Sequence, residues 1–371
     1  MSRYRFELAT PADDADLRQI MAATPMHGSM VVSFRREPSY FDAAVVEGQF
    51  RQVVAARDLE TGRVVGFGAR SISTRFVNGE PMPIGYLSSL RLLAEHRKIS
   101  LVARGYRYFR ELHQDSRTKL YLTTIAVENH AVMDLLTSGR AGLPTYRPAG
   151  NYFTFALPTA SIRNSSLSRD CFEIREATAE DLPAIADFMQ AQSRHRQFFP
   201  QYDMKDFGDA RKLLRGLRLC DLRLATAGNE ILGMAGFWNQ QPFRQTVIDE
   251  YRGTLRMGRP LLNWTAKFFK QPQLPPRGGQ LRSIFTALPL VAENDPEVFA
   301  GLINRLLADV PRAEADYLLL GMHESDPYLS VARSFSGRCY TTRLFLVTWD
   351  DGRDLATSLD GRPIYLELGA L

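Results

Sequence analysis

An apolar stretch that starts at Gly85 ends in a basic turn at Arg97 and Lys98, and helical periodicity follows from Ile99 to Leu112. The backbone N–H groups in the first turn of a helix have no internal partners, and the helix dipole adds partial positive charge there. The two cationic side chains add full charges at the same end. The pattern therefore predicts a site that holds a phosphate or pyrophosphate group.

Metal and redox chemistry are not indicated by the histidines and cysteines. His96 and His130 flank the basic turn, but no two histidines have the H-x-x-x-H spacing of a metal site. The cysteines also lack a paired C-x-x-C arrangement, so we expect reduced packing residues at all three positions, Cys171, Cys220 and Cys339. We predict no metal site.

The composition is that of an ordinary globular protein, with 371 residues of which 45% are hydrophobic and 23% are charged. This length exceeds what one hydrophobic core usually organises, so two domains are expected. The formal net charge of +5 suits an anionic cofactor as well as nucleic acid, and gives no strong signal for the latter. The sequence has no secretory leader and no run of about 18 apolar residues, which predicts a cytoplasmic protein.

The same order of patterns occurs twice along the chain, which indicates an internal repeat. Each half opens with a strand, a helix N-cap and an amphipathic helix, at 4–21 and again at 172–189, where Thr178 and Asp181 form a capping-box pattern. Each half continues with a hairpin pattern, and later with a strand, a polar turn and a helix. The repeat predicts two similar α/β domains, each a mixed central sheet flanked by helices.

A serine-rich polar stretch between the halves is typical of an exposed linker. We therefore predict a first domain over residues 1–160, a linker over 161–170 and a second domain over 171–371. The second half carries an insertion near 242–279, where basic residues lie among aromatic ones and the stretch 247–269 has a partly helical pattern. Such a pattern either covers a neighbouring surface or binds acidic membranes or nucleic acid.

Two stretches of the first half resemble the signature of the GNAT family of N-acyltransferases. The strand end 90–97 (LRLLAEHR) is similar to the family's strand, which ends in an acidic residue, an aromatic residue and an arginine, and Arg97 begins a loop similar to the family's Arg-x-x-Gly-x-Gly/Ala loop. The stretch 126–136 (AVENHAVMDLL) is similar to the family's later strand, asparagine and helix. The resemblance implies a tandem GNAT protein that acts as an N-acyltransferase with acetyl-coenzyme A or another acyl-coenzyme A as co-substrate.

In the family's geometry, the pantetheine arm of the cofactor pairs with the strand and its pyrophosphate lies on the loop. The resemblance assigns backbone contacts with the arm to Leu90 and Leu92 and a further contact to Asn129; alternatively, Asn129 only caps a helix. The other cofactor-binding positions are in the loop and the first helical turn: Arg97, Lys98, Ile99, Ser100, Leu101 and Val102. Ser100 and Val102 stand where the family has glycine, and the Val102 side chain is expected to crowd the pyrophosphate.

The family's usual catalytic groups are missing from their places. Leu136 stands where family members often carry the tyrosine that protonates the leaving thiolate, so Tyr146 or Tyr152 is the candidate replacement. The preferred candidate for the general base on or after the strand is Ser88, and the other candidates are Ser89, Glu95 and Glu128. His27 lies in a region that lines the acceptor site in relatives, and it is either solvated or part of that site.

In the second half the corresponding turn is acidic. Glu293, Asp295 and Glu297 place three carboxylates where a pyrophosphate would lie, so cofactor binding is expected in the first half alone. The leading hypothesis is transfer of an acyl group, most simply acetyl, from acyl-coenzyme A to a primary amine of a small molecule or peptide. Two alternatives stay open: a catalytically silent GNAT scaffold, or a transferase with another acyl or aminoacyl carrier, in which residues 247–270 contact the carrier or a membrane surface.

Overall fold

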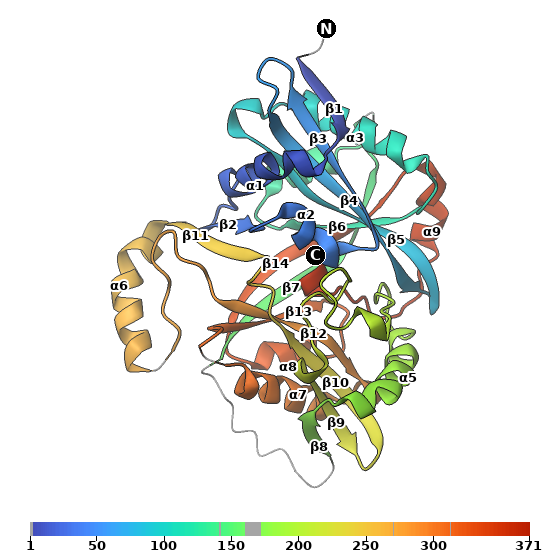
Figure 1. Ribbon diagram of the computed structural model, residues 1–371, viewed down its shortest axis with the longest axis vertical. Helices are drawn as coiled ribbons and strands as arrows, with labels where there is room; N and C mark the ends of the chain where they lie inside the picture. The colour runs from blue at the N-terminus through green and yellow to red at the C-terminus, as the bar shows by residue number, and fades with distance from the viewer. Residues whose placement is uncertain (1–2, 141, 160–171, 270, 312) are drawn as a thin grey trace.

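The computed structural model describes residues 3–140, 142–159, 172–269, 271–311 and 313–371. The predicted linker, Cys171 and Lys270 lie outside the described residues. Helices flank one large mixed sheet, so the α/β class that the repeat predicts is confirmed (Figure 1).

Most helices and strands follow one another in the same order in both halves. The first half contains β1 (Tyr4–Leu8), α1 (Asp14–Ala23), β2 (Met30–Arg35), α2 (Tyr40–Ala43), β3 (Phe50–Asp58), β4 (Val64–Val77), β5 (Glu80–Leu92), α3 (Ile99–His113), β6 (Tyr121–Ala126), α4 (His130–Leu136) and β7 (Thr145–Pro158). The second half contains β8 (Glu173–Glu176), α5 (Leu182–Ser193), β9 (Leu222–Ala227), β10 (Glu230–Trp238), β11 (Gln245–Tyr251), α6 (Gly253–Phe268), β12 (Ser283–Val291), α7 (Pro296–Asp309), β13 (Tyr317–His323), α8 (Leu329–Ser334), β14 (Arg338–Thr348) and α9 (Arg353–Thr357). The exceptions are that β2 and α2 precede the hairpin in the first half, β11 and α6 follow it in the second, and α9 is added at the end. Thr178 and Asp181 form the predicted capping box ahead of α5.

In the part of the chain that the structure describes, twelve strands form a single sheet in the order β1-β3-β4-β5-β6-β14-β7-β13-β12-β10-β9-β8. The order is symmetric when it is followed inward from the two edges. An antiparallel series, β1-β3-β4-β5 or β8-β9-β10-β12, comes first, and a parallel strand, β6 or β13, comes next. The internal repeat in the sequence is therefore a repeat of topology.

The last strand of each half lies in the other half. β7 pairs with β13 from Tyr152 to Pro158, and β14 pairs with β6 from Tyr121 to Ala126. β7 and β14 also pair with each other, which joins the two half-sheets into one. The repeat in the sequence predicts a separate sheet in each half and gives no sign of this exchange.

Each exchanged strand buries apolar side chains in the core of the other half. Phe155 and Leu157 of β7 pack with Phe299 of α7, while Phe345 and Val347 of β14 pack in the core beneath α3. Full burial of one such side chain contributes about 1.5–3 kcal/mol. Neither core is complete without the strand that comes from the other half of the chain.

A two-stranded ribbon also links the halves. β2 of the first half pairs antiparallel with β11 of the second, from Arg35 beside Gln245 to Met30 beside Tyr251. α6 follows β11 and extends away from the sheet, as Figure 1 shows in gold. Most of the predicted insertion is therefore a strand followed by a helix. Across the described residues, no helix combines the length and the apolarity needed to cross a membrane.

Candidate active site

β5 and β6 pair only near Gly85 and Tyr121 and then separate. The parallel register ends one residue further along each strand, but β5 runs on to Leu92. Ser89 has a left-handed φ of 57°, where β5 also shifts its register against β4, and this bulge bends the strand. Within the described part of the chain, no strand pairs with the β6-facing edge of β5 beyond Tyr86. Thr123 Oγ1 of β6 still donates to the Leu87 carbonyl oxygen at 2.8 Å, and beyond Leu87 the edge offers backbone donors and acceptors to an extended ligand.

The open edge of β5 leads to the N-terminus of α3. Arg97 Nε donates to the carbonyl oxygen of Leu92 at 3.2 Å, which holds the arginine at the end of the strand. Lys98 is the N-cap residue of α3, and its side chain forms no capping hydrogen bond. Both cationic residues are exposed, as are Ile99 and Ser100. First-turn N–H groups, the helix dipole and two cations meet here, an arrangement that fits a pyrophosphate.

The expectation that the Val102 side chain crowds this end of the helix is wrong. Val102 is 9% exposed and packs inward with Val54 and Phe109. The reason is helical periodicity, because positions 102 and 109 lie on the same face, and that face covers the sheet. Leu101 is buried as well, in a cluster with Tyr4 of β1. Of the two residues that replace the family's glycines, Val102 is therefore turned away from the N-terminus of α3. The small, exposed side chain of Ser100 is the one that remains near it.

Ser88 lies on the open part of β5 with an unused hydroxyl group. Its Oγ atom is buried and has no hydrogen-bond partner among the described residues. Leaving a buried hydroxyl without a partner costs free energy, so this atom is a candidate for contact with a ligand. Leu90, two residues further along, is a large apolar residue that is 40% exposed. An extended ligand along this edge would cover Leu90 and give Ser88 a partner.

The two candidate tyrosines lie in the protein core. The hydroxyl of Tyr146 is hydrogen-bonded to that of Tyr106 of α3, and burial raises the pKa of Tyr146 well above its usual value. Tyr152 donates to the carbonyl oxygen of Leu366 at 2.9 Å, and burial raises its pKa as well. A raised pKa makes a phenol a weaker acid. The structure therefore gives neither tyrosine an arrangement suited to protonating a thiolate.

Loop residues gather near Glu128 just beyond the end of β6. Asn129 is exposed and caps α4 by accepting a hydrogen bond from its first turn, which confirms the capping interpretation and leaves the cofactor contact a prediction. Gly28 lies nearby, because a Cβ atom added there would be 3.9 Å from a Glu128 carboxylate oxygen, and the adjacent His27 is exposed. Tyr340 on β14 is 40% exposed, and partial loss of solvent around its ring, together with the Glu128 charge, raises its pKa to about 12. The sequence gives no signal for Tyr340, because β14 comes from the other half.

In the second half, two carboxylate side chains of the chain bind the backbone N–H groups at the positions that correspond to the β5 edge and to the N-terminus of α3. Leu288 repeats the left-handed bulge with a φ of 52°, and its N–H donates to Glu367 Oε2 at 3.1 Å. Asp295 caps α7 by accepting from the N–H groups of Glu297 and Val298. One carboxylate thus closes the strand edge and another closes the helix N-terminus. Among the described residues, no carboxylate binds at either of these places in the first half.

A buried cluster of charged residues borders the Ser89 bulge. Glu47 accepts hydrogen bonds from Arg36 and, at 2.6 Å, from Arg244, and the Arg36 guanidinium lies 4.5 Å from the centre of the Tyr40 ring. Burial lowers the pKa of Arg244 to about 10 and raises that of Tyr40, whose hydroxyl is close enough to Ser89 for the two to interact. Because Arg244 comes from the second half, the cluster fixes that half against the bulge.

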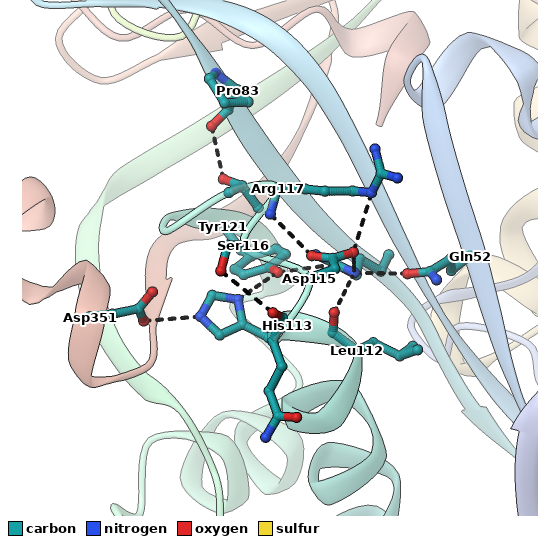
Figure 2. Close-up of polar contacts among 12 residues, drawn as sticks. Gln52, Pro83, Leu112, His113, Asp115, Ser116, Arg117, Tyr121 and Asp351 are labelled. Atoms are coloured by element: carbon teal, nitrogen blue, oxygen red, sulfur yellow. Dashed lines mark hydrogen bonds and ion pairs between the residues drawn. The ribbon is translucent and has the colours of Figure 1, made fainter.

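A second polar network, at the C-terminal end of α3, has the residue types of a catalytic relay. His113 is hydrogen-bonded to Tyr121 and to Asp351, both at 2.9 Å (Figure 2). Arg70 donates to the Tyr121 hydroxyl at 3.0 Å and forms a two-pronged ion pair with Asp115. Because α3 has 15 residues, the network lies about 20 Å from the helix N-terminus. We assign it a structural role, which is to join the C-terminal segment to the first half.

No protein-family model matches the sequence, and no curated protein does. Solved structures match it in fold. N-myristoyltransferase of Saccharomyces cerevisiae with bound myristoyl-CoA superposes with a TM-score of 0.59 and 11% identity, over 94% of this chain and 83% of that chain. A GCN5-related N-acetyltransferase from Sphaerobacter thermophilus gives 0.57 and 10%, over 93% and 96%. One from Anabaena variabilis gives 0.51 and 11%, over 93% and 72%.

Proposed function

We propose that this chain, which has the GNAT fold, is an acyl-coenzyme A-dependent N-acyltransferase that binds its co-substrate in the first half. The observation that carries the proposal is the open β5 edge that leads to the basic N-terminus of α3. A pantetheine arm suits the edge, and a pyrophosphate suits the helix end. Glu367 and Asp295 close the same places in the second half, which supports binding by one half alone.

The proposed reaction is direct attack of a primary amine on the thioester carbonyl carbon. A C–N bond forms, the C–S bond breaks, and one proton passes from the amine to the leaving thiolate. The chain contributes by holding the two reactants together, with β5 orienting the extended arm and Arg97 holding the charged end. The Ser88 hydroxyl, which has no partner among the described residues, donates a hydrogen bond to the bound thioester segment. Acetyl is the simplest acyl group for this site.

Calorimetric titration with acetyl-coenzyme A and with myristoyl-coenzyme A tests the proposal. The Arg97→Glu substitution places a negative charge beside the α3 N-terminus, so we expect the affinity for the bound thioester to fall at least tenfold. Arg110→Glu is the matched control, because it makes the same change of charge in the last turn of the same helix. It should leave the affinity unchanged.

Equal weakening by both charge reversals would show that overall charge, and not the α3 N-terminus, attracts the ligand. If neither thioester binds to the unsubstituted chain, the proposal is wrong. The catalytically silent scaffold and the transferase with another carrier would then be the remaining interpretations.

Ser88→Ala and Tyr146→Phe should have opposite effects. Ser88→Ala removes a hydroxyl that has no partner, so we expect the free energy of unfolding to change by less than about 0.5 kcal/mol and turnover to fall about tenfold or more. Tyr146→Phe breaks the buried bond to Tyr106 and should cost about 1 kcal/mol of stability without slowing turnover. Urea unfolding and thiol release from acetyl-coenzyme A with a panel of amines measure the two effects. The reverse pattern would return the catalytic role to Tyr146.

A further inference from the structure

The outer face of α6 carries a stripe of large, exposed apolar side chains. Met257, Leu261, Trp264 and Phe268 are 78%, 65%, 68% and 76% exposed, respectively. Their spacing places all four on one face of the helix, because successive residues are rotated by about 100°. Isolated exposed apolar residues are ordinary, but a continuous stripe of this kind marks a surface that contacts something apolar.

The inner face of α6 is already occupied by the chain's own residues. The Asn263 side chain is hydrogen-bonded to both the N–H and the carbonyl oxygen of Leu274, at 2.8 and 3.0 Å. Leu255 packs against the small cluster of Ile248, Tyr251 and Leu274. These contacts fix the orientation of the helix. The apolar stripe therefore faces outward because the opposite side is held, and it does not cover the sheet.

The charged residues of α6 itself are all positive, and the acidic neighbour just before the helix is Glu250, which pairs with Arg252 and also feels the charge of Arg256. The sequence from 252 to 292 contains no aspartate and no glutamate. Arg256 and Lys267 are both exposed, and helical rotation places them on the same border of the stripe, about three turns apart. An apolar stripe of tryptophan, phenylalanine and leucine, with arginine and lysine beside it, is the arrangement of a helix that lies in the surface of a membrane.

We propose that the outer face of α6 binds the surface of an anionic lipid bilayer. The apolar side chains would enter the boundary between headgroups and acyl chains, while Arg256 and Lys267 would contact lipid phosphates and carboxylates. A second copy of this chain fits less well, because a symmetric contact would bring the same cations together. The proposal is independent of the acyl-transfer reaction, since it rests on α6 alone.

Co-sedimentation of the full chain with vesicles tests the proposal. Vesicles of phosphatidylcholine mixed with phosphatidylserine should bind it, vesicles of phosphatidylcholine alone should bind it at least tenfold more weakly, and added salt should weaken binding. Trp264 provides a direct signal, because Trp238 and Trp349 are buried, so its fluorescence should shift to the blue on the vesicles. The double substitution Trp264→Ser/Phe268→Ser should reduce binding at least tenfold, and Arg256→Gln/Lys267→Gln several-fold.

The matched control is Leu8→Ser/Leu59→Ser, which changes two apolar residues that are 41% and 50% exposed elsewhere on the molecule. This variant should bind the anionic vesicles as the unsubstituted chain does. Equal loss in the control and the α6 variants would overturn the proposal, as would equal binding to neutral and anionic vesicles. An absence of vesicle binding would also overturn the proposal. Dimerisation, or binding of an acidic carrier protein, through Trp264 and Phe268 would then identify the partner of the stripe.

Discussion

Replacing Glu47 by glutamine is expected to lower the free energy of unfolding by about 3–5 kcal/mol, because the change leaves two buried guanidinium groups without their shared counter-charge. The side chains of Glu47, Arg36 and Arg244 are 2%, 8% and 12% exposed, so water cannot replace the lost carboxylate. Glutamine keeps the size of the side chain, which confines the change to charge and hydrogen bonding. Urea unfolding followed by circular dichroism measures the loss.

The control for this change is Glu60→Gln. Glu60 also pairs with an arginine, Arg3, but the two side chains are 63% and 43% exposed. An exposed pair of this kind contributes at most about 1 kcal/mol. A similar loss at Glu47 and Glu60 would show that the Glu47 cluster does not hold the halves together, and would contradict the role that we give it.

Gly85→Ala is expected to destabilise the protein by about 1–3 kcal/mol and to weaken thioester binding. A Cβ atom at position 85 would lie 2.1 Å from the Tyr121 ring. The ring cannot move aside easily, because its hydroxyl is bonded to Arg70 and His113 and its edge packs against Trp349. The added methyl group must therefore push β5 from β6 at the point where the two strands part, and alter the edge that would receive the pantetheine arm.

Gly258→Ala is the matched control for Gly85→Ala. At position 258, inside α6, the same methyl group meets no described atom within 4 Å other than its chain neighbours and the adjacent backbone of its own helix. Because alanine favours helix more than glycine does, this variant should be slightly more stable, by up to about 1 kcal/mol. If Gly85→Ala were as well tolerated, the close packing of Gly85 on Tyr121 would not control the separation of the strands.

Local patterns in the sequence were sufficient to predict most of the elements and the GNAT fold. The capping box of Thr178 and Asp181, the two hairpins and the strand, turn and helix around Arg97 all depend on residues that are close together in the chain. The burial of Val102 had a usable signal too, because residues 102, 106 and 109 share one helical face. The expectation that all three cysteines pack inside fails at Cys339, which is exposed on β14.

Contacts between distant segments left no local signal. The exchange of β7 and β14 depends on which of several similar apolar strands pairs with which, and periodicity cannot distinguish them. Glu367 accepts a hydrogen bond from the Leu288 N–H group, and the two residues are 79 positions apart in the chain. The sequence therefore does not reveal that a carboxylate occupies this strand edge in the second half. The same holds for the pairing of Arg244 with Glu47, which are 197 residues apart.

The strand exchange also determines when the first half can finish folding during synthesis. β6 has left the ribosome long before β14, which follows about 200 residues later and pairs along its edge. During that interval the emerging first half has an uncovered strand edge and a core without Phe345 and Val347. Pairings between such distant segments form slowly, and the incomplete sheet is exposed to mispairing meanwhile. The first half therefore cannot complete its sheet and its core until β14 has been made.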